Sequence, residues 1–120
     1  MRHFRIDDIP DQPDNSPIFV GSVTRKSMVT DENPGLLRAN IVTFHFGARN
    51  KLHHHETDQL LVVTAGEGIV ATGDEEFQVA VGDVIHVPAG ERHWHGAKPG
   101  STFSHISILT PGGITIDEED

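Results

Sequence analysis

Histidine is the residue type in this chain with the clearest capacity for chemistry. Nine histidines occur among the 120 residues, and there is no cysteine. Residues 53–55 are His-His-His, followed by Gln59, and His93 and His95 repeat the spacing of two. On an extended strand, residues two apart point to the same face with Cα atoms about 6.6–7 Å apart. His53 and His55 can therefore converge on one metal ion, whose third ligand must come from another strand. The same spacing would also occur on a solvent-exposed strand, or in buried histidines whose hydrogen bonds are satisfied within the core.

Composition narrows the class of protein. A length of 120 residues suggests one domain, and the net charge of −9 argues against nucleic-acid phosphates as a partner. The lack of cysteine excludes disulfides, thiol nucleophiles and iron–sulfur clusters. No apolar run approaches the roughly 20 residues of a membrane span, and the first residues lack the apolar stretch of a signal peptide. We therefore expect a cytoplasmic protein that does not bind membranes.

The elements that must position the histidines are short strands. Apolar or alternating runs, separated by glycine, proline, asparagine and aspartate, cover residues 18–24, 36–46, 59–64, 68–72, 77–81, 84–87, 93–96 and 103–109. A turn is expected at Ala65-Gly66, between two of these runs. Regularly spaced short strands predict an all-β sandwich or barrel. We divide the chain into an N-terminal arm (1–17), the barrel (18–112) and a solvated acidic tail (113–120).

Two spaced motifs resemble those of a known family. The first is Gly47, His53, His55, Gln59 and Gly66, with five, one, three and six residues between them. The second runs from Gly82 through Pro88-Ala89-Gly90 and His93 to Ala97. Together they resemble the two cupin motifs, with glutamine and alanine where the usual patterns have glutamate and asparagine. The resemblance implies a small jelly-roll β-barrel, the cupin fold, with little of the chain outside one barrel.

The cupin resemblance also implies a metal site. Carried over residue by residue, it assigns His53, His55, Gln59 and His93 as metal ligands. Three imidazoles and an amide oxygen suit divalent manganese, iron, nickel, cobalt or zinc, of which we favour manganese. Glutamine leaves the full charge of the ion uncompensated, which strengthens it as a Lewis acid and weighs against redox chemistry. The alternative for Gln59 is that it pairs with backbone instead of the metal.

Further residues are assigned by strand parity and by the same resemblance. Around the motifs and His105, the chain is similar to the manganese-dependent hydroxynitrile lyases of cupin fold, which implies that His105 is the catalytic acid/base group. A pKa near 6.5 would suit that role, while the alternative is a buried structural histidine. His95 shares the face of His93. The expected substrate pocket consists of Asn40, Val42, Phe44 and His95.

Three functions follow as hypotheses. The first is a metal-dependent lyase or isomerase without a redox step, acting on a small oxygenated metabolite. The second is an Fe(II)-dependent dioxygenase, and the third is a non-catalytic cupin that binds a small ligand or sugar. Small cupins commonly form dimers through an N-terminal strand, so we also expect a homodimer in which residues 1–30 cover a sheet edge.

Overall fold

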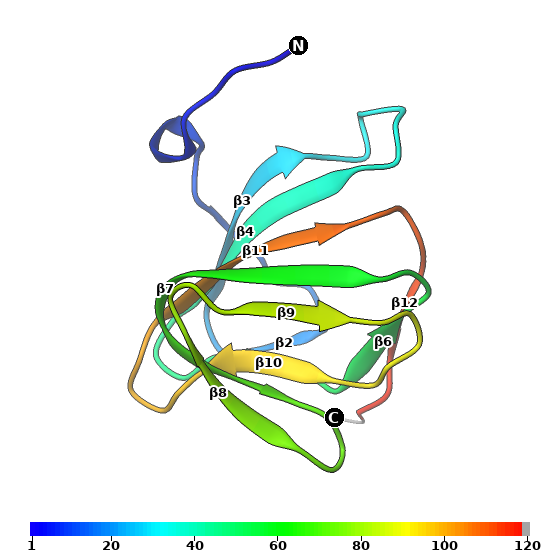
Figure 1. Cartoon of the computed structure of the whole chain (residues 1–120). Coiled ribbons are helices and arrows are strands. Elements are labelled where there is room, and N and C mark those ends of the chain that lie inside the picture. The colour runs from blue at the N-terminus through cyan, green and yellow to red at the C-terminus, as the bar shows by residue number, and fades with distance from the viewer. Residues whose placement is uncertain (119–120) are drawn as a thin grey trace.

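The computed structural model describes residues 1–118, and Glu119 and Asp120 of the expected tail lie outside the described residues. The chain is nearly all-β, as predicted, and Figure 1 shows its strands curled into a half-barrel. No helix among residues 1–118 is long and apolar enough to cross a membrane. The elements in order are η1 (Ile6–Asp8), β1 (Gln12–Pro13), β2 (Phe19–Val20), β3 (Val23–Val29), β4 (Arg38–Phe44), β5 (Arg49–Asn50), β6 (His53–His55), β7 (Gln59–Ala71), β8 (Glu76–Ala80), β9 (Val84–Val87), β10 (Trp94–Ala97), β11 (Phe103–Leu109) and β12 (Ile114–Ile116).

One large antiparallel sheet forms the barrel wall. Its strand order is β1-β3-β4-β11-β7-β10-β5-β2, with β8 and β9 also pairing with β7. Strand β7 is continuous through Gly66, so the expected turn at Ala65-Gly66 is wrong. Gly66 has a φ of +71°, and the register of β7 against β11 shifts beside it. The irregularity lets one long strand bend and serve both halves of the sheet.

Cross-strand rows determine what faces the interior. In one row Val23, Phe44 and Phe103 pair across β3, β4 and β11, and they belong to the buried apolar core. The next row is Arg25, Val42 and His105, and the one after it is Ser27, Asn40 and Ser107. Because side chains alternate between faces along a strand, all three rows face the same side. The interior is therefore apolar at one end and becomes polar towards the other.

A second, two-stranded sheet closes the polar end. Strand β12 pairs antiparallel with β6, so that Ile114 lies opposite His55 and Ile116 opposite His53. Asp117 contacts His54 at 2.8 Å, and Glu118 pairs with Arg49 at 2.9 Å. The segment expected to be a solvated tail thus contains a strand and two ion-pair partners.

Candidate metal centre

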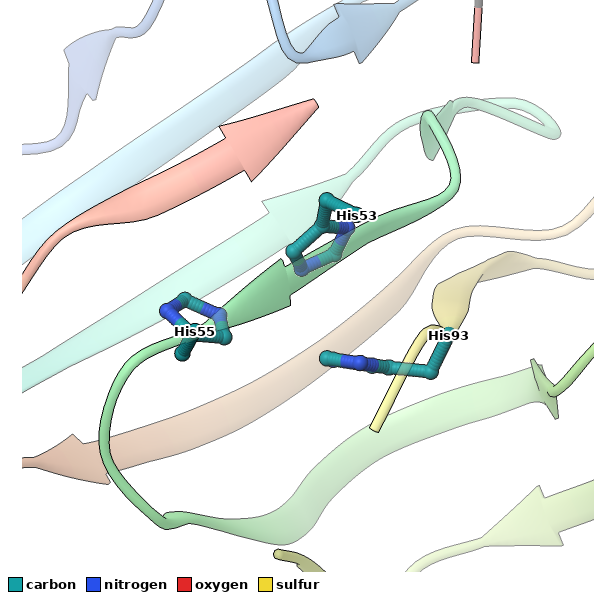
Figure 2. A group of neighbouring side chains, drawn as sticks. All are labelled: His53, His55 and His93. Atoms are coloured by element: carbon teal, nitrogen blue, oxygen red, sulfur yellow. The ribbon is translucent and has the colours of Figure 1, made fainter. Parts of the chain in front are cut away.

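Three histidines from two segments meet inside the barrel. Strand β6 carries His53 and His55, and His93 immediately precedes β10. The backbones of His53 and His93 exchange two N–H···O bonds of 2.9 Å, which fixes these segments against each other. One ring nitrogen from each of the three histidines lies within 4.8 Å of the others. Figure 2 shows their imidazoles around one common space.

Hydrogen bonds orient two of these rings. His53 Nδ1 donates to the Lys51 carbonyl at 2.6 Å, and His93 Nδ1 donates to the Glu91 carbonyl at 2.9 Å. A neutral imidazole that donates through Nδ1 has a lone pair on Nε2. His55 Nε2 is buried and has no hydrogen-bond partner within residues 1–118. Each histidine therefore has an Nε2 atom that could face a metal, and His53 and His93 also have the supporting bond that ligand histidines usually have.

Burial keeps these histidines in the form that binds metals. It lowers the pKa of His53 to about 3, with a further contribution from His93, and lowers the pKa of His55 to about 4. Burial also lowers the pKa of His93. Imidazole must be neutral to act as a ligand, and all three rings are neutral at physiological pH.

Gln59 supplies a fourth donor atom. Its side chain is buried, and its Nε2 donates to Ser107 Oγ at 2.8 Å, which leaves Oε1 as an acceptor. Oε1 lies 3.3 Å from His93 Nε2. Two acceptors facing each other repel unless a cation lies beside both. Two ligands that share one ion at about 2.1 Å each must lie within about 4.2 Å of each other, and the 3.3 Å spacing meets this condition.

The donor set therefore fits a divalent transition metal. Three imidazole nitrogens and one amide oxygen form a site of intermediate hardness, open to manganese, iron, cobalt, nickel or zinc. All four side chains are neutral, so the positive charge of a bound ion stays uncompensated by its ligands.

A hydrogen-bonded histidine pair lies next to this cluster. His105 Nε2 is 3.0 Å from His95 Nδ1, and both residues are buried. Asn50 Oδ1 accepts the backbone N–H of His95 at 2.8 Å, and Asn50 Nδ2 donates to His95 Nε2 at 3.1 Å. A neutral His95 then has its proton on Nδ1 and donates it to the Nε2 lone pair of His105.

The pKa of His105 departs from its ordinary value. Burial lowers its pKa to about 4, whereas the sequence alone suggested a value near 6.5. The ring is therefore neutral at physiological pH, which suits a base that accepts a proton more than an acid that starts with one.

The predicted pocket residues line one cavity of about 480 Å³. Its walls include two of the three clustered histidines, Gln59, His105 and all four expected pocket residues, which are Asn40, Val42, Phe44 and His95. Asn40 Oδ1 is buried in the structure without a hydrogen-bond partner among residues 1–118.

Sequence reasoning missed several polar residues of this cavity. Arg25, Asn50 and Ser107 also line it. Ser107 is two residues from His105 on β11, so strand parity could have identified it. Arg25 shares the face of the buried Val23 in the same way, whereas nothing in the sequence marks Asn50.

Comparison with known proteins agrees with the fold. Residues 40–108 match the Cupin_2 family model, described as Cupin domain. An (R)-mandelonitrile lyase from Granulicella tundricola is 37% identical over 91 residues, which are 75% of this chain and 70% of that protein. An acireductone dioxygenase from Exiguobacterium sibiricum is 28% identical over 115 residues, which are 81% of this chain and 64% of that protein.

A solved structure shows the same architecture. A cupin-like protein from Thermotoga maritima superposes with a TM-score of 0.84 at 34% identity, covering 92% of this chain and 87% of that one. The family match covers more than half of the chain and contains all four donor residues of the site. The chain belongs to the cupin family.

Proposed function

We propose that this cupin is a metal-dependent enzyme of lyase or isomerase type that acts without a redox step on a small oxygenated metabolite. The observation that carries the proposal is that a cluster of four neutral donors lies beside the His95–His105 pair, with three of the donors and both histidines of the pair lining one cavity. A bound divalent ion, for which manganese is our first choice, would act there as a Lewis acid towards a substrate oxygen.

The residues of the chain then have separate tasks. Asn50 holds His95 through two hydrogen bonds, and His95 in turn orients the ring of His105. To take up the proton of a substrate hydroxyl, the lone pair on His105 Nε2 would exchange its hydrogen bond from His95 Nδ1 for one from that hydroxyl. Val42 and Phe44 give the cavity part of an apolar wall.

Similarity to a protein named (R)-mandelonitrile lyase supports cyanohydrin cleavage as the first reaction to test. In this reaction the hydroxyl proton passes to His105, the bond to the nitrile carbon breaks, and cyanide leaves and recovers a proton. The products are an aldehyde and hydrogen cyanide.

The experiment measures release of benzaldehyde and cyanide from mandelonitrile by the manganese-loaded protein. We expect turnover that falls about 10²–10⁴-fold in His105→Ala while metal content stays unchanged. His86→Ala is the matched control, because His86 is exposed and pairs with Asp58. Equal activity of wild type and His105→Ala would contradict the role of His105, and an inactive wild type would refute cyanohydrin cleavage.

A second function is an Fe(II)-dependent dioxygenase, which the match to an acireductone dioxygenase favours. An assay without oxygen separates the two. Lyase turnover is expected to continue under nitrogen, whereas oxygen-dependent turnover of the iron-loaded protein would support the dioxygenase. A third outcome, ligand binding without any turnover, would indicate a non-catalytic cupin.

We also propose that the protein is a cytoplasmic homodimer. Its N-terminal residues extend away from the barrel, and Met1, Phe4 and Ile6 expose large apolar side chains. Burying them against a second copy would remove apolar surface from water. A mass of one chain, 13.1 kDa, in light scattering would refute the dimer.

A further inference from the structure

Arg25 occupies an unusual place for a charged side chain. On β3 it lies opposite Val42, and Val42 lies opposite His105 on β11, so that the three form one interior row. Arg25 lines the same cavity as His53, His55 and Gln59. A guanidinium group thus shares the cavity with the proposed metal centre and the proposed base.

Only part of this guanidinium group is engaged by the protein. Its Nε donates to Asp14 Oδ2 at 2.8 Å, and Asp14 is in turn held by Ser16. Within residues 1–118, no hydrogen-bond partner is found for the two Nη groups of Arg25. An arginine fixed through Nε still has a fork of Nη donors that matches the two oxygens of a carboxylate.

The second arginine of the cavity is different. Arg38 donates through Nε to Asp31 and through Nη1 to the carbonyls of Gly35 and Leu37. Most of its hydrogen-bonding capacity is used to shape the loop before β4. Arg25 is therefore the better candidate for an anion, and Arg38 provides a control of equal charge.

The charge and polarity of the cavity agree with this choice. Arg25 and Arg38 each have one acidic partner, while the four donors of the proposed metal site are neutral. A bound divalent ion would leave the cavity with excess positive charge, which favours an anionic ligand. Asn40 Oδ1, in the row next to Arg25, has no donor among residues 1–118 and can accept a hydrogen bond from a hydroxyl group of the same ligand.

We propose that Arg25 binds a carboxylate of the substrate and thereby determines its class, a small hydroxy- or oxo-carboxylic acid. The carboxylate lies on the Nη atoms of Arg25, and a second oxygen is directed to the metal centre. This proposal deepens the proposed function, because the placement of the second oxygen at the metal centre rests on it. The contact between Arg25 and a carboxylate can be measured as binding and does not depend on turnover.

The test measures binding of dicarboxylates to the zinc-loaded protein by calorimetry. Succinate, glutarate and adipate cover a range of lengths, and each is compared with its monomethyl ester, which has one carboxylate left for the metal. For the best-fitting length we expect the diacid to bind about 10- to 100-fold more tightly than its ester. Arg25→Met should abolish this preference and leave binding of the ester unchanged, and Arg25→Lys should restore part of it.

Two controls make the result specific. Arg38→Met removes the same charge from the same cavity and should keep the preference for the diacid. Asp14→Asn removes the salt bridge of Arg25 and should also keep the preference for the diacid. This variant separates loss of the anion contact from disturbance of the N-terminal arm (1–17). Metal content and melting temperature identify variants that do not fold.

The proposal is overturned if wild type does not prefer any diacid, or if Arg25→Met and Arg38→Met lose the preference equally. Failure of the proposed reaction has a different signature. In that case the wild type would turn over neither cyanohydrins nor hydroxy acids, and the Arg25-dependent preference for the diacid would remain.

Discussion

The amide of Gln59 can serve a metal only if its oxygen faces the histidines, and one hydroxyl group determines that orientation. The Ser107 hydroxyl accepts a hydrogen bond from Gln59 Nε2, which leaves Oε1 beside His93 Nε2. Without Ser107 the amide can rotate, and its Nε2 hydrogens would then repel a cation. Ser107 is therefore not a ligand itself, but it orients Gln59 so that Oε1 faces the histidines.

We predict that Ser107→Ala lowers the affinity for divalent metal roughly tenfold, as is usual for residues that orient a ligand. Ser104→Ala is the matched control, because Ser104 lies on the same strand and bonds to Thr43 outside the cavity. Titration of manganese or zinc against a competing chelator measures both affinities. If the two variants bind metal equally well, Ser107 does not orient Gln59.

Among the elements, strand β10, which directly follows the ligand His93, passes unusually close to the backbone of β5. Gly96 lies opposite Arg49, and a Cβ atom on Gly96 would lie 2.6 Å from the Ala48 carbonyl oxygen and 2.6 Å from Arg49 Cα. Both neighbours are backbone atoms, so they cannot move aside as a flexible side chain would. The close approach of β10 and β5 therefore requires glycine at this position.

We predict that Gly96→Ala destabilises the protein by roughly 2–3 kcal/mol, as overpacking against a rigid neighbour does. Gly73→Ala is the control, because a Cβ atom there meets nothing within 4 Å, and its effect should stay within about 0.5 kcal/mol. Urea unfolding measures both values. A neutral Gly96→Ala would mean that β10 and β5 can separate without cost.

At the same scale, the sequence predicted what depends on local spacing and missed what depends on pairing between distant strands. The two motifs place His53, His55, Gln59 and His93 at fixed intervals, and their resemblance to the cupin motifs implied the barrel and grouped these four residues. The contact of Gln59 with Ser107 joins residues 48 positions apart, and it exists only once β7 and β11 are in register. Gly66 was misread for the same reason, since a bend within one strand and a turn between two strands look alike in sequence.

For the molecule as a whole, burying so many histidines has a cost that depends on pH. The pKa is about 3 for His53 and about 4 for His55 and His105 in the folded chain. In the unfolded chain these groups titrate near 6.5. Between these values the unfolded state binds more protons than the folded state, so stability rises with pH in this range. The full stability is present above about pH 6.5 and is lost as pH falls towards the folded-state values.

We therefore predict that the metal-free protein loses stability steeply between pH 6.5 and 5. Each of the three histidines contributes at most about 1.4 kcal/mol per pH unit, so together they account for a loss of at most roughly 6 kcal/mol over this range. That is a large share of the roughly 5–15 kcal/mol by which a domain is stable. Urea unfolding of the metal-free chain at pH 7.5, 6.5, 5.5 and 5 measures the slope.

A bound metal should raise stability at every pH where the ligands are neutral, because it binds the folded chain alone. A flat profile for the metal-free protein would mean that these rings are accessible to protons in the native state, and the closed, neutral cluster described above would then be wrong.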